Sequence, residues 1–121
     1  MPKYLLRFKY GKANRLIRAY DAIVKRYHER LLDAKGTTFK GSQNMKVPTL
    51  ADKQYLLNRL HTEEKKLQYK TRRISDKNLD TVILPHPLMG KMPVREIIMW
   101  TAYHVEHHTE ILKANYSNLR Y

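Results

Sequence analysis

The chain has 121 residues, a length that suits one small folded domain. It contains no cysteine, which excludes a disulfide framework, a thiolate zinc site and a cysteine nucleophile. The 24 Lys and Arg residues against 11 Asp and Glu give a net charge of +13, which permits nucleic acid, anionic lipid or an acidic substrate as a partner.

The first predicted element is a basic, aromatic N-terminal segment, residues 1–13, which Gly11 interrupts. Between residues 14 and 34 the apolar positions recur at intervals of three and four, which predicts an amphipathic helix that ends near Gly36. The positions that define this apolar stripe are Ile17, Tyr20, Val24, Tyr27 and Leu31.

Two further helices are predicted in the rest of the chain. Thr49 and Asp52 have the spacing of a capping box, which predicts a second helix over residues 50–73. Pro93 suits the first position of a helix, so a third helix is predicted over residues 94–115.

The expected fold class is all-α, because the apolar run 81–84 is too short to found a sheet. We expect an up-down helical bundle of about three helices in a single domain over residues 1–121. No apolar run approaches the roughly 18 residues of a membrane span, and the N-terminus lacks the apolar stretch of a signal peptide. The sequence therefore predicts a cytoplasmic chain without membrane attachment.

The third predicted helix carries the side chains best suited to chemistry, His104 and His108. Because they are four residues apart, they lie on one face of a helix, where two imidazoles can share one divalent metal ion. A helical wheel puts His108 near the centre of the apolar sector, whereas His107 falls at its edge and Glu106 points away. Two interpretations stay open, a metal-binding pair and histidines that bind no metal.

The segment from His86 to Leu112 resembles the closing part of the DinB-like superfamily, whose members include bacillithiol transferases and mycothiol-dependent enzymes. Three features of that family occur here in order: a His-Pro-x-x-Gly turn at 86–90, a helix, and His-x-x-His-His at 104–108. The resemblance implies a four-helix bundle that binds a divalent metal through three histidines, two of which match His104 and His108. It also implies a member that lacks the family's first helices, because only two long helices fit before His86.

The third ligand of the family has no clear match in this chain, and two residues are candidates for it. His28 lies on the apolar side of the first predicted helix and could face the core as a ligand. The alternative interpretation is a histidine at the margin of the apolar stripe that binds no metal. Glu64 lies on the leucine face of the second helix and could be a ligand, a ligand-orienting group or a general base; its alternative is a salt bridge. For His86, in the turn, we expect a structural hydrogen bond rather than ligation.

Three functions are compatible with these patterns. By resemblance, the first is a metal-dependent thiol S-transferase or hydrolase, with zinc or nickel, or else manganese or iron, and a low-molecular-weight thiol drawn to the basic surface. The second is a non-catalytic helical interaction module. For both the enzyme and the interaction module we expect a homodimer, because the missing helices leave apolar faces uncovered. The third, a basic nucleic-acid-binding protein, is not favoured, because the sequence has no zinc finger, RNP pattern or Gly-x-x-Gly loop.

Overall fold

The computed structural model describes residues 2–38 and 43–117. The chain divides into two compact units, and unit 1 comprises Met1–Lys35 with Lys77–Tyr121 while unit 2 comprises Gly36–Asp76. Helices predominate, as the sequence predicts. Within the described ranges, no helix is both long enough and apolar enough to cross a membrane.

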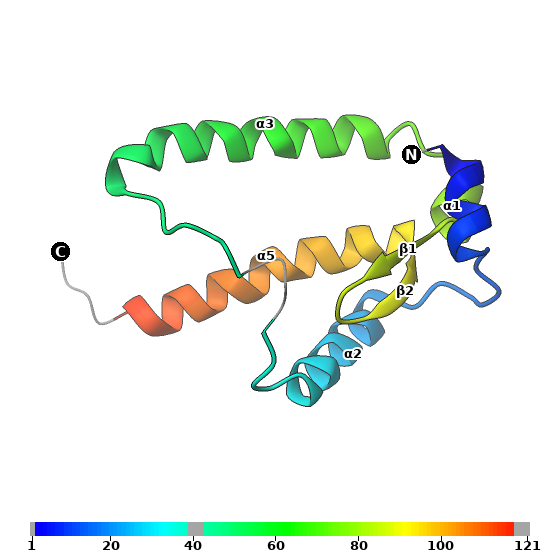
Figure 1. Ribbon diagram of the computed structural model, residues 1–121, viewed down its shortest axis with the longest axis horizontal. Coiled ribbons are helices and arrows are strands. Elements are labelled where there is room, and N and C mark those ends of the chain that lie inside the picture. The colour runs from blue at the N-terminus through cyan, green and yellow to red at the C-terminus, as the bar shows by residue number, and fades with distance from the viewer. Residues whose placement is uncertain (1, 39–42, 118–121) are drawn as a thin grey trace. The chain divides into compact units, whose positions relative to one another are not determined.

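The elements of unit 1 come from both ends of the chain. Helix α5 packs against α2, and two short strands lie at the N-terminal end of α5 (Figure 1). The helices are α1 (Lys3–Tyr10), α2 (Tyr20–Asp33), α4 (Asp76–Thr81) and α5 (Val94–Tyr116), and the strands are β1 (Ile83–His86) and β2 (Gly90–Pro93).

The N-terminal segment, predicted only as basic and aromatic, contains a helix of its own. Helix α1 ends at Gly11, whose φ of 85° lies in the left-handed region that favours glycine. After this glycine, Lys12 forms an antiparallel bridge with Val82, and the N–H of Ala13 donates to the carbonyl of Thr81 at 3.1 Å. The segment is therefore attached to the start of β1 by backbone hydrogen bonds.

The first predicted helix, 14–34, is shorter than its apolar pattern suggests, because α2 begins only at Tyr20. The residues before it are not helical, and two of them, Arg15 and Arg18, bind the carboxylate of Glu96 on α5. These contacts hold the chain out of the helix, so tertiary structure overrides the local periodicity here. The third helix agrees with its predicted range to within one residue.

The prediction of a purely all-α fold was wrong, since β1 and β2 pair as an antiparallel hairpin. Both strands are short and contain proline, which a two-stranded sheet tolerates because each strand is an edge. Gly90 closes the turn with a φ of 77°, a conformation that favours glycine. The register pairs Ile83 with Pro93, Leu84 with Met92, Pro85 with Lys91 and His86 with Gly90.

The ring of His86 stabilises this hairpin turn. Its Nδ1 accepts hydrogen bonds from the backbone N–H groups of Leu88 at 3.1 Å and Met89 at 3.0 Å. The structural role expected for His86 is confirmed, and the turn places Met89 in the core. That core lies where α2, α5 and the hairpin meet, and its buried members are Ile23, Tyr27, Met89 and Met92.

Unit 2 consists mainly of one long helix. The second predicted helix, 50–73, corresponds to a 3₁₀ turn, η2 (Leu50–Asp52), followed by α3 (Lys53–Thr71). The capping box is confirmed, because the Asp52 carboxylate accepts from the backbone N–H of Thr49 at 3.2 Å and the Thr49 side chain accepts from the backbone N–H of Asp52.

Candidate metal half-site

The rings of His104 and His108 lie together on α5, as their spacing predicts. Their Nε2 atoms are 3.0 Å apart and their ring centroids 4.4 Å apart. Two nitrogens bound to one tetrahedral zinc ion at about 2.0–2.1 Å are roughly 3.3 Å apart, so a small adjustment of either ring would admit an ion. We call these two residues the half-site.

Tyr27, on α2, provides the hydrogen bond that can orient the half-site. Its hydroxyl lies 3.1 Å from Nδ1 of His104. Burial, with a smaller contribution from Tyr103, raises the pKa of Tyr27, so its hydroxyl keeps its proton. When Nδ1–H of His104 donates to this hydroxyl, Nε2 keeps its lone pair for a metal or for the N–H of His108.

The helical wheel put His108 near the centre of the apolar sector and His107 at its edge. In the structure the order is reversed, because His107 is half-buried and His108 is exposed. The His107 ring contacts α2, with centroid distances of 5.6 Å to Tyr27 and 5.8 Å to His28. The wheel counted every apolar side chain on α5, but several of them are not covered by α2. Val105 is 65% exposed, Ile111 42% and Leu112 57%.

The two candidates for a third ligand have other partners in this structure. Nε2 of His28 makes a short hydrogen bond with the hydroxyl of Tyr103, so this histidine lies beside His107 rather than on the half-site. Glu64 belongs to unit 2, where its carboxylate accepts from Gln68 at 3.2 Å. Among the residues that the structure describes, no group of three His, Asp or Glu side chains is placed to hold a metal ion.

A stack of rings connects the hairpin turn with the half-site. Trp100 lies 4.5 Å from the ring of His104 in a stacked arrangement and 4.2 Å from the ring of His86, edge to face. Burial first, and then the neighbouring His108 and His107, lower the pKa of His104. The ring is therefore held neutral, which is the form that binds metal.

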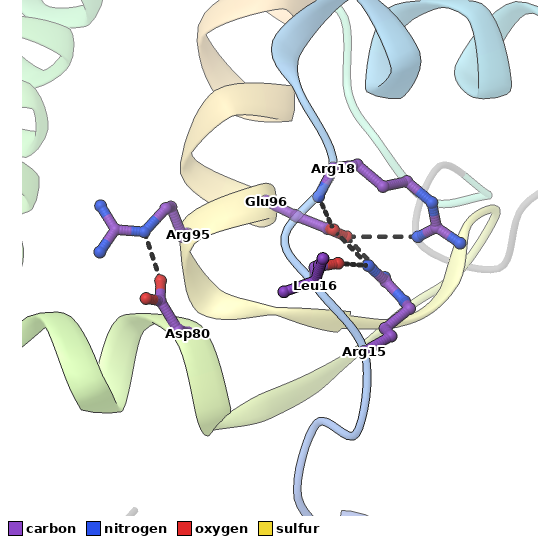
Figure 2. Close-up of polar contacts among 6 residues, drawn as sticks. All are labelled: Arg15, Leu16, Arg18, Asp80, Arg95 and Glu96. Carbon is purple, nitrogen blue, oxygen red and sulfur yellow. Dashed lines mark hydrogen bonds and ion pairs between the residues drawn. The ribbon is translucent and has the colours of Figure 1, made fainter.

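The buried carboxylate of Glu96 fixes the start of α5 (Figure 2). It accepts from Arg15 Nη1 at 2.5 Å and Nη2 at 2.7 Å, and from the backbone N–H of Arg18 at 2.8 Å. Beside it, Arg95 donates to Asp80 on α4 (Figure 2). Together these contacts connect α5 to α4 and to the segment before α2, and so determine how the helices around the half-site pack.

The Glu96 contacts predict a loss of stability in acid. Burial would raise the pKa of Glu96, but the hydrogen bonds from Arg15 and Arg18 outweigh it and hold that pKa below its ordinary value of 4.5. The stabilisation is therefore complete above pH 4.5 and is lost as the pH falls from there through the folded-state pKa. Carboxyl ¹³C NMR should give a Glu96 midpoint below 4.5, with the thermal midpoint falling over the same range; a midpoint above 4.5 contradicts this.

Sequence reasoning missed several side chains that position the half-site. Tyr27 appeared only as part of an apolar stripe, and neither Tyr103 nor Glu96 was given a role. The one available signal was that a glutamate follows Pro93 at the start of an otherwise apolar helix face.

Neither a family model, nor a curated protein, nor a solved structure matches the chain. The resemblance to DinB-like proteins therefore rests on the residues from His86 to Leu112.

Proposed function

We propose that this protein binds a divalent transition metal through His104 and His108. The observation that carries the proposal is the 3.0 Å separation of the two Nε2 atoms, with Tyr27 at the opposite ring nitrogen of His104. A hydrogen-bonded group at that nitrogen is the usual partner of a metal-binding histidine, because it fixes the tautomer and the ring orientation. Zinc and nickel both suit imidazole donors, and manganese or iron is the alternative.

The DinB-like resemblance extends this proposal to metal-dependent thiol S-transfer or hydrolysis. A bound divalent ion would supply Lewis acidity and lower the pKa of a bound thiol or water. In this chain, His104 and His108 would hold the ion, Tyr27 would orient His104, and Trp100 would cover one face of that ring. The basic surface favours an anionic thiol as the substrate.

The half-site needs further donors, and we propose that a second copy of the chain supplies them. Two histidines from each of two chains give the four nitrogen ligands of a tetrahedral site. Unit 2 offers an independent reason for self-association, since one amphipathic helix cannot bury its own apolar face. On α3 that face is formed by Leu56, Leu57, Leu60 and Leu67, all at least 39% exposed.

Titration with Zn²⁺ and with Ni²⁺, combined with sedimentation velocity, tests both parts of the proposal. The expected result is one ion bound per two chains and a dimer whose dissociation constant falls when metal is added, because the ion bridges the two copies. One ion per chain on a monomer would contradict the shared site while retaining the metal site. A chain that binds neither ion at micromolar concentrations contradicts the metal proposal and leaves the non-catalytic helical module.

A further inference from the structure

A pocket beside the hairpin turn is lined by five Arg or Lys side chains, together with His86 and four uncharged residues of the turn. It has a volume of about 420 Å³ and lies within unit 1, between the segment before α2, α2 itself and the turn that joins β1 to β2. Small-molecule sites are typically about 300–1,000 Å³. Its charged and polar lining residues are Arg15, Arg18, Arg26, Arg30, His86 and Lys91.

The positive charge of this pocket is only partly compensated. Arg15 and Arg18 share one carboxylate, that of Glu96. Arg30 lies 4.0 Å from Asp33 in an exposed pair, which is worth little in water. Burial, and then the charges of Arg18, Arg30 and Arg15, lower the pKa of Arg26.

Two hydrogen-bond donors on the lining residues have no acceptor among the residues that the structure describes. Nε of Arg26 is buried without a partner, and so is Nε2 of His86. Since Nδ1 of His86 accepts from two backbone N–H groups, its Nε2 must carry the proton of the neutral ring and is also a donor. Buried donors without acceptors are rare in proteins, and of the four among the described residues, two are on residues that line this pocket.

We propose that this pocket binds the phosphate group of a small molecule. A phosphate carries up to two negative charges and three strong acceptor oxygens, which match the planar donor sets of several arginines. The pocket has room for one such group with a small substituent, and residues 86–91 of the hairpin form part of its lining. No residue that lines this pocket is a proposed metal ligand, although the ring of Trp100 contacts both His86 of the pocket and His104 of the half-site.

Isothermal titration with inorganic phosphate and with glucose 6-phosphate tests the proposal on the full chain. Arg26→Gln and Arg30→Gln should each weaken binding at least about tenfold, since each removes a charged phosphate donor. Arg30 is exposed, so its variant should fold even where loss of Arg26 perturbs α2. Arg59→Gln, which removes the same charge from α3 in unit 2, is the matched control and should change affinity less than about twofold.

The two ligands distinguish the source of the phosphate. Tighter binding of the sugar phosphate points to an organic phosphate, and equal binding points to a site for the free ion. Equal weakening by Arg59→Gln and Arg26→Gln would overturn the proposal, because the attraction would then come from net charge alone. Binding of a single-stranded oligonucleotide that 10-fold excess phosphate does not displace would also overturn it in favour of nucleic acid.

Discussion

Replacing Glu96 with glutamine is expected to lower the free energy of unfolding by about 3 kcal/mol, the lower end of the cost of breaking a buried ion pair. The carboxylate is fully buried, and the amide nitrogen of glutamine would face donors on Arg15 and Arg18. The cost stays at the lower end because these arginine side chains are 33% and 32% exposed and can be partly solvated. Urea unfolding followed by circular dichroism measures the change.

The matched control for this variant is Glu110→Gln on the same helix. Glu110 makes an exposed contact with Lys113 three residues on, at 3.5 Å, so its loss should cost no more than about 0.5 kcal/mol. Equal effects of the two substitutions would show that the Glu96 contacts contribute no more than a surface pair. A large effect confined to Glu96 would show that the start of α5 is held by this carboxylate.

The second large effect is expected at the half-site, where His104→Ala and His108→Ala should each weaken metal binding roughly 100-fold or more, since each removes a direct ligand. Tyr27→Phe keeps the buried ring but removes the hydroxyl at Nδ1 of His104, and should weaken binding about tenfold. His107→Ala should leave affinity nearly intact, because the His107 ring packs against Tyr27 and the ring of His108, whereas the paired Nε2 atoms belong to His104 and His108. Competition against a chromogenic chelator measures these affinities.

His61→Ala is the control for loss of a histidine as such, because His61 is exposed on α3 in unit 2. It should leave the affinity unchanged. Equal losses in His107→Ala and His108→Ala would show that the helix presents a different face to the metal. Affinity that no histidine variant changes would remove the metal-dependent enzyme from consideration.

The sequence predicted the long helices because their evidence is local. Thr49 and Asp52 cap α3, Pro93 precedes α5, and the histidine pair meets because an i, i+4 spacing has one geometry on any helix. Each of these predictions depends on residues within one or two helical turns. That is why they agree with the structure to within a few residues.

The features that sequence reasoning missed depend on residues far apart in the chain. Arg15 and Glu96 are 81 positions apart, and only their pairing explains why α2 starts late. The hairpin was missed because its proline-containing strands lack the usual alternation, although Gly90 marked its turn. The covered side of α5 was misjudged because the pattern gives only an apolar sector, whereas the packing of α2 and the hairpin determines which part of that sector is covered.

The stacking of Trp100 on His104 gives the protein an internal optical probe. Trp100 is the only tryptophan in the chain, and the centroid of its ring lies 4.5 Å from that of His104. Nε2 of His104 faces Nε2 of His108. An imidazole that gains a proton or a metal ion changes charge directly beside the indole. Because the Trp100 ring also lies 4.2 Å from the ring of His86, which lines the arginine-lined pocket, its intrinsic fluorescence reports events at both sites without a label.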